Sequence, residues 1–160
     1  MTETNHPSST ESVRNLSIYL DTTVLLAYTL TKLVEKKKYK QTRRLIARVD
    51  AGEIRAITSF YALHEVLIFA LRNAPNPEAG RRLGKDALLA ILQTDVEILP
   101  MLTREEKILH ARDFSVIKDP SDVSHAISAY LHGCQIVVSY DRHFADVPAP
   151  LVWKTPAELV

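Results

Sequence analysis

The sequence predicts an α/β fold in which a central, mainly parallel sheet of four to five strands is flanked by helices. Short apolar segments rich in β-forming residues alternate with longer helical segments, which is the pattern of such folds. The length of 160 residues suits one domain with a substantial core, and 46% hydrophobic against 24% charged residues is typical of a globular protein. We therefore expect one domain over residues 16–160, preceded by a disordered polar tail over residues 1–15.

The first half of the chain is expected to contribute two strands and four helices. The strands are the short apolar segments 16–20 and 54–58. The expected helices cover residues 22 to about 30, 34–49, 60–72 and 78–93. Segment 60–72, "FYALHEVLIFALR", is too long and too apolar for a strand. Because its apolar residues surround almost the whole helix, we expect this helix to be buried.

The second half is expected to add three strands and two helices. The strands cover residues 96–99, 135–140 and 151–153, the last at an edge of the sheet. Thr103, followed three residues later by Glu106, forms a capping box that predicts a helix to about Phe114. The second helix, over residues 119–133, begins with Asp119 and Pro120, a good N-cap and first-turn pair, and ends at a glycine.

Cysteine content and hydropathy indicate a cytoplasmic protein without a membrane segment. Cys134 is the only cysteine, so no intrachain disulfide can form and a reducing compartment is expected. No apolar run approaches the ~20 residues that a membrane-spanning helix needs. Residues 1–15 lack the apolar segment of a secretory signal.

Positive charge is concentrated in two blocks, although the net charge is only +1. The second block consists of Arg81, Arg82 and Lys85. The first block lies on the helix expected over residues 34–49 and contains Lys36, Lys37, Lys38, Lys40, Arg43, Arg44 and Arg48. Two interpretations remain open, a solvated helix face or a face that contacts phosphates.

Four acids are candidate functional residues: Asp21, Glu65, Asp122 and Asp141. Asp21 ends the first strand and Asp141 follows the strand expected over residues 135–140, and ligands of parallel sheets bind beyond such carboxyl ends. Each aspartate also has a structural alternative. Asp21 could cap the next helix, Asp122 could interact favourably with the dipole of its own helix, and Asp141 could belong to a turn.

Glu65 is harder to explain structurally, because it lies on the apolar helix 60–72. Glutamate is rarely buried unless it is paired or binds a ligand. Arg72 is a possible partner seven residues along the same face, but two helical turns are a long reach. A polar pocket or a metal ion is the better explanation. A phosphatase of the D-x-D type is not supported, because Thr23 occupies the position of the second acid.

Four segments together resemble a known family. In order, "IYLDTTVLLAY", "SFYALHEVLIFAL", "DPSDVSHAISAYLHG" and "IVVSYDRHFADVP" resemble the four acidic blocks of PIN-domain nucleases, and most of all those of VapC-type ribonuclease toxins. The resemblance runs from about Leu16 to Trp153 and implies a PIN-like domain. It also implies that the acidic cluster binds Mg²⁺ or Mn²⁺, the hard ions that prefer carboxylate oxygens. The cluster consists of Asp21, Glu65, Asp122 and Asp141.

The same resemblance suggests roles for individual residues. Asp21 and Asp122 are the first choices for direct metal ligands, and Asp141 is a further ligand, directly or through water. Glu65 would orient the attacking water. Thr22 and Ser139 would hydrogen-bond the ligands.

The resemblance implies an endoribonuclease that hydrolyses RNA, the toxin of a type II toxin–antitoxin pair, which forms a homodimer and binds a small antitoxin protein. One alternative is a PIN nuclease of RNA processing or decay. Another is a degenerate PIN-like module that binds RNA or protein without cleavage, although the presence of all four acids argues against it.

Overall fold

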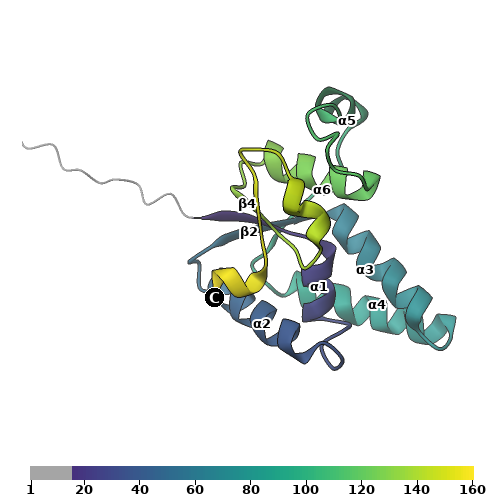
Figure 1. The fold of residues 1–160 in the computed structure, drawn as a ribbon. Coiled ribbons are helices and arrows are strands. Elements are labelled where there is room, and N and C mark those ends of the chain that lie inside the picture. Colours follow the sequence, from purple (N-terminus) through teal and green to yellow (C-terminus); the bar gives the residue numbers. More distant parts are fainter. Residues whose placement is uncertain (1–15) are drawn as a thin grey trace, which may run out of the picture.

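A five-stranded sheet forms the centre of the molecule (Figure 1). The computed structural model describes residues 16–160, so the expected tail over residues 1–15 lies outside the described residues. Every adjacent pair of strands is parallel, and their order is β3-β2-β1-β4-β5. The strands are β1 (Ser17–Leu20), β2 (Arg55–Ser59), β3 (Glu97–Leu99), β4 (Ile136–Val138) and β5 (Val152–Lys154). The predicted α/β fold with a parallel sheet is confirmed.

Helices connect the strands and cover both faces of the sheet. The α-helices are α1 (Thr22–Tyr28), α2 (Lys36–Asp50), α3 (Phe60–Asn73), α4 (Pro77–Leu92), α5 (Arg104–His110) and α6 (Pro120–Leu131). Two short 3₁₀ helices follow, η1 (Arg142–Asp146) and η2 (Pro156–Leu159). The predicted capping box at Thr103 and the predicted N-cap at Asp119 are both present. Among residues 16–160, no helix combines the length and apolarity that crossing a membrane requires.

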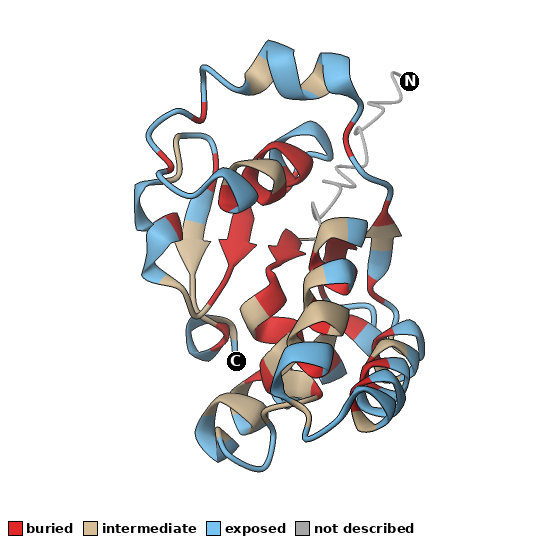
Figure 2. Cartoon of the chain, turned by 90° about the vertical axis from the view of Figure 1, so that its right-hand side faces the viewer, coloured by how far each residue is buried: buried red, intermediate tan, exposed pale blue. Residues whose placement is uncertain are grey.

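The sheet separates two hydrophobic cores, because successive side chains of a strand point to opposite faces. Ile18 and Leu20 of β1 belong to the core formed with α1, α2, α3 and α4. Tyr19, between them, belongs to the other core, where it packs with residues of α6 and with Phe144 of η1. Figure 1 shows α6 on one side of the sheet and α1 and α2 on the other, and Figure 2 shows the buried central strands.

Two expected helices are longer in the prediction than in the structure. Helix α2 begins at Lys36, because residues 31–35 form a turn in which the Thr31 hydroxyl donates to Glu35 Oε2 at 2.8 Å. Helix α5 ends at His110, and the chain then turns so that Phe114 and Ile117 reach the core. Strand β4 is shorter than expected, because the chain leaves it after Val138.

Helix α3 is amphipathic, so the expectation of a helix buried nearly all round is wrong. Ala62, Val66 and Ala70 are buried, whereas Phe60 is 53% exposed and Leu71 is 37% exposed. Some of the apolar residues of α3 outside the core pack closely against α4. A Cβ atom on Gly80 of α4 would lie 3.0 Å from the Cα atom of Leu71. The α3–α4 hairpin therefore depends on a residue without a side chain at this crossing.

We expect Gly80→Ala to lower the free energy of unfolding by about 1 kcal/mol. Alanine improves helix propensity by up to ~1 kcal/mol, but overpacking against helix backbone costs about 1–3 kcal/mol. The control is Gly84→Ala, where the nearest obstacle is Leu67 Cδ1, the movable end of a side chain, at 2.6 Å. Urea denaturation measures both variants. A Gly80→Ala protein as stable as Gly84→Ala would contradict the packing argument.

Candidate active site

The candidate site lies where the chain changes direction across the sheet. The chain proceeds from β1 to β2 and β3 on one side and returns to β4 on the other, so the carboxyl ends of β1 and β4 form a topological switch point. Asp21 directly follows β1, and Asp141 follows β4 by three residues. Asp122 comes from the first turn of α6, and Glu65 comes from α3.

Asp21 is held in place by three hydrogen bonds to one carboxylate oxygen. Its Oδ2 atom accepts from the Thr23 backbone N–H at 3.1 Å, from the Thr23 hydroxyl at 2.7 Å and from the Ser139 hydroxyl at 2.8 Å. Ser139 Oγ in turn accepts from the backbone N–H of Asp141 at 2.9 Å. This serine hydroxyl therefore links the ends of β1 and β4 and the two aspartates that follow them.

Glu65 has its own partners, on α1 and α6. The Thr22 hydroxyl donates to Glu65 Oε2, and Nε2 of His125 lies 3.3 Å from the same oxygen. Burial raises the pKa of Glu65, but the hydrogen bond and charge of His125, helped by Thr22, outweigh it and hold the pKa below its usual value. Arg72, the partner considered from the sequence, is exposed. Of the two consecutive threonines, Thr22 therefore holds Glu65 and Thr23 holds Asp21.

Asp122 is the acid whose environment most favours a cation. It is only 9% exposed, and within the described part of the chain its Oδ2 atom is buried without a hydrogen-bond partner. Burial, followed by the charges of Asp21, Asp119 and Asp141, raises the pKa of Asp122 to about 6. Of the predicted acids, Asp21 and Asp141 are thus close enough to Asp122 to disfavour its charge, as is Asp119.

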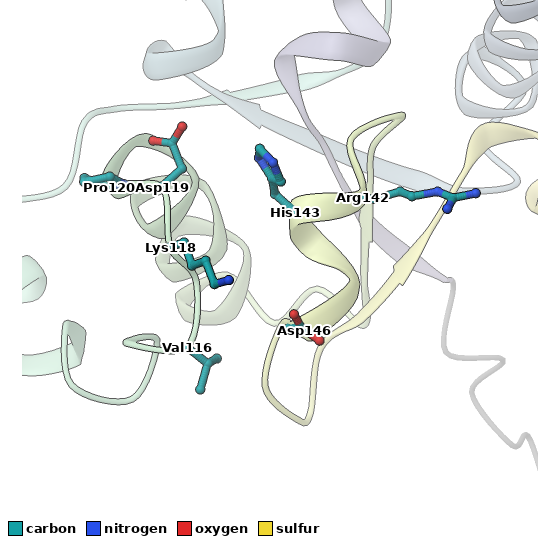
Figure 3. A pocket seen from close by; sticks show the side chains of 7 residues that line it. All are labelled: Val116, Lys118, Asp119, Pro120, Arg142, His143 and Asp146. Atoms are coloured by element: carbon teal, nitrogen blue, oxygen red, sulfur yellow. The ribbon is translucent and has the colours of Figure 1, made fainter.

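Carboxylate and imidazole groups converge beside Asp122. Potential ligand atoms of Asp119, Asp122 and His143 all lie within 4.8 Å of one another. Nδ1 of His143 lies 3.6 Å from Asp122 Oδ2 and 3.4 Å from Asp141 Oδ2. Figure 3 shows Asp119 at the start of α6 and His143 on η1, at the rim of a hollow that Lys118 and Arg142 also line. A buried carboxylate oxygen without a hydrogen-bond partner in the described chain, close to a second carboxylate, fits a hard divalent cation.

Four residues of this neighbourhood were not predicted as site residues: Thr23, Asp119, His125 and His143. The sequence predicts Asp119 only as an N-cap, which it is, since Oδ1 accepts from the Ser121 backbone N–H at 2.9 Å. The cap uses one oxygen and leaves the other available. The spacing of His125 and His143 in the sequence does not indicate a shared site. Only the packing of α6 and η1 brings them to the acids.

The first basic block reaches the site through one residue. Lys38 lines a hollow together with Asp141 and Arg142, and its Nζ atom lies 5.2 Å from the centre of the Tyr140 ring. The remaining cations predicted to bind RNA do not line this hollow, and they are exposed on α2: Lys36, Lys37, Lys40, Arg43 and Arg44.

The protein has an α/β fold, and acidic side chains from several elements meet at the switch point of its parallel sheet. These side chains form a candidate metal-dependent active site. The sequence matches the PIN domain family over residues 18–150, and the chain belongs to that family. A search for relatives among curated proteins found no match.

Solved structures with the same fold include three bacterial examples. One is a chain of DNA-bound VapBC from Salmonella typhimurium, with 20% identity, a TM-score of 0.61, and 88% of this chain and 98% of that chain covered. VapC20 from Mycobacterium tuberculosis, a sarcin–ricin loop cleaving toxin, has 20% identity and a TM-score of 0.59, with 80% and 92% covered. A chain of FitAcB from Neisseria gonorrhoeae has 18% identity and a TM-score of 0.61, with 87% and 97% covered. At these identities the likeness shows a shared fold.

We expect Asp122→Asn to stabilise the metal-free protein at pH 8, by an amount on the order of 1 kcal/mol or ~2–4 °C in Tm. Because the pKa of Asp122 is about 6 in the folded protein and ~3.9 in an unfolded chain, ionisation of Asp122 disfavours the folded state. This destabilisation develops as the pH rises from about 4 to about 6, so wild type and variant should converge near pH 4.

Melting curves in EDTA across this pH range measure the effect, with Asp119→Asn as the control. Hydrogen bonds from Ser121 lower the pKa of Asp119, so its ionised form is not disfavoured by folding. Asparagine also caps helices as well as aspartate does. Asp119→Asn should therefore not raise the Tm at pH 8. An Asp122→Asn protein that melts below wild type at pH 8 would contradict the proposed repulsion.

Proposed function

We propose that this protein is an Mg²⁺- or Mn²⁺-dependent endoribonuclease that hydrolyses phosphodiester bonds of RNA, and that it acts as the toxin of a toxin–antitoxin pair. One observation carries the proposal: the buried Oδ2 atom of Asp122 has no hydrogen-bond partner within the described residues, and the charges of Asp21, Asp119 and Asp141 act on this carboxylate at the switch point of a PIN fold.

The residues that would hold the ion are Asp21, Asp122 and Asp141, with Glu65 beside them. When bound, a divalent ion lowers the pKa of a water ligand and neutralises charge on the phosphoryl oxygens. Asp21 is suited to this role because the three hydrogen bonds found for its carboxylate within residues 16–160 all go to Oδ2, and Oδ1 stays available. In Asp141, Oδ1 accepts a hydrogen bond from the His143 backbone N–H, and Oδ2 lies 3.4 Å from Nδ1 of the His143 ring, on the side of the site.

Glu65 is suited to orient the attacking water and accept its proton. Thr22 and His125 both contact Oε2, which fixes the rotation of the carboxylate and leaves Oε1 for the water. The pKa of Glu65 is below its usual value, so the carboxylate is ionised at neutral pH and can accept a hydrogen bond from the water.

Cations beside the acids support a polyanionic substrate. Arg142 lines both the hollow with Asp119 and His143 and the hollow with Lys38 and Asp141. A strand of nucleic acid crossing the acids would meet these cations with its phosphates. The fold shared with VapC20, a sarcin–ricin loop cleaving toxin, supports RNA as the substrate.

We expect RNA cleavage that requires Mg²⁺ or Mn²⁺, stops in EDTA and returns on metal addition. Asp21→Asn and Asp141→Asn should each lower the rate by about two or more orders of magnitude. Asp86→Asn, on the exposed surface of α4, is the matched control and should retain full activity. Circular dichroism and melting verify folding, and fluorescent RNA pools report cleavage.

Undiminished cleavage by a folded Asp21→Asn or Asp141→Asn protein would remove that residue from the mechanism. A wild-type protein that binds RNA pools and cleaves none of them would favour the degenerate PIN-like module.

Exposed apolar side chains support a homodimer and a small antitoxin partner. Leu33 and Val34, between α1 and α2, are 77% and 87% exposed, and Ile108 and Leu109 of α5 are 67% and 72% exposed. Helix α5 contains no buried residue. Neighbouring apolar side chains this exposed are available for contacts with another protein, and chains of VapBC and FitAcB share this fold. In α1, by contrast, the apolar residues Val24, Leu25 and Ala27 are buried in the core. The single buried thiol of Cys134 supports the expected cytoplasmic location.

We expect light scattering at micromolar concentration to give twice the 18.0 kDa mass of one chain. The double change Ile108→Ser and Leu109→Ser should shift the mass toward the monomer without lowering the Tm, because neither side chain belongs to the core. The product of the adjacent reading frame should co-purify with the wild type. A monomer without any co-purifying partner would contradict both associations and would favour a nuclease of RNA processing or decay.

A further inference from the structure

A chain of hydrogen bonds crosses the core beneath the candidate site and ends at Glu65. The Tyr19 hydroxyl lies 2.5 Å from Ser59 Oγ and 2.7 Å from Nδ1 of His125. Nε2 of the same imidazole lies 3.3 Å from Glu65 Oε2. The four residues come from β1, β2, α6 and α3, so this chain connects the sheet to helices on both of its faces.

These polar groups lie in a region where apolar residues would be expected. Tyr19 and Ser59 have no exposed surface, and His125 is 1% exposed. Their neighbours on this face of the sheet are apolar, for example Ile57 and Phe144. Buried polar groups cost stability unless every partner is present, and a phenylalanine and a leucine could fill the same space without that requirement. The series of hydrogen bonds ends at the Glu65 carboxylate of the candidate site, and this offers a functional reason for the buried polar groups.

The direction of the last hydrogen bond does not depend on the charge of the histidine. An ionised carboxylate only accepts hydrogen bonds, so Nε2 must donate to Glu65. In the neutral imidazole, Nδ1 accepts from the Tyr19 hydroxyl, and in the imidazolium, Nδ1 donates to it. In both states the tyrosine fixes the orientation of the ring and therefore the position of the Nε2 donor.

We propose that His125 is a positioning residue that, with Thr22, holds Oε2 of Glu65 so that Oε1 faces the attacking water, and that Tyr19 orients His125 for this task. This inference rests on the proposed nuclease function. The two donors come from different helices, α1 and α6, so together they restrict the rotation of a carboxylate that is about one-third exposed, at 35%. Loss of one donor frees the carboxylate to turn away from the water.

Two substitutions of His125 separate positioning from packing, since the side-chain amide of glutamine reaches about as far as Nε2, and that of asparagine about as far as Nδ1. We expect His125→Gln to keep kcat within about threefold of wild type, because it retains a donor to Glu65. His125→Asn retains a partner for Tyr19 but not for Glu65. It should lower kcat by about 10²-fold with little change in KM, as expected for a lost contribution to proton transfer.

Two further variants keep the inference testable if a His125 variant fails to fold. Thr22→Val removes the second donor to Glu65 and should also lower kcat more than it changes KM. Tyr19→Phe removes the hydrogen bond to Nδ1 and should lower kcat by a smaller factor. The melting temperature of each variant shows whether a lower kcat only reflects unfolding.

Histidine ¹⁵N NMR of the metal-free protein tests the contact without any catalysis. Glu65→Gln should shift the Nε2 resonance of His125, because the carboxylate that accepts its hydrogen bond is gone. An unchanged resonance would overturn the inference. Equal kcat for His125→Gln and His125→Asn in an active, folded protein would overturn it as well and leave His125 as a core residue. A wild type that cleaves no RNA would instead contradict the proposed function, and with it the reaction for which Glu65 is positioned.

Discussion

Repulsion between carboxylates at one edge of the sheet is the constraint on which the rest of the site depends. Asp21, Asp119 and Asp141 each cap the helix that follows, and each gives one oxygen to a backbone N–H. A cap uses only part of a carboxylate, so the same residue can stabilise a helix start and present its second oxygen to the site. Asp122 caps nothing. Its buried Oδ2 atom has no hydrogen-bond partner in the described chain, and burial, followed by the charges of the other three acids, raises its pKa to about 6.

Small hydroxyl side chains hold this arrangement of acids in place. The hydroxyls of Thr23 and Ser139 donate to Asp21 and accept from the backbone N–H groups of Tyr140 and Asp141, so the ends of β1 and β4 are joined through the acid. Thr22 donates to Glu65 from the next position of the chain. Hydrogen bonds from neighbouring donors therefore offset the cost of placing the Asp21 carboxylate at the point where β1 leaves the core. Such a compromise between stability and function is common at active sites.

The fold was predictable because its elements follow simple periodicity, whereas parts of the site depend on contacts that no local pattern encodes. Alternating strands and helices gave the parallel sheet, and the strand ends gave Asp21 and Asp141. The assignment of Thr22 to Glu65 and of Thr23 to Asp21 depends on side-chain directions at the start of α1. His125 and Tyr19 meet across 106 positions of sequence, and residues so far apart show no spacing signal. The basic block of α2 reaches the site only through Lys38, because successive helix residues point in different directions.

The central claim is that these carboxylates form one cation site. Anomalous diffraction from crystals grown with Mn²⁺ tests it most directly, because the metal is located by its own scattering. We expect a manganese peak at the carboxyl ends of β1 and β4, bound by Oδ2 of Asp122 and by at least one of Asp21 and Asp141, and no such peak in crystals of Asp122→Asn. Manganese bound elsewhere, or an ordered site that does not include Asp122, would contradict the claim.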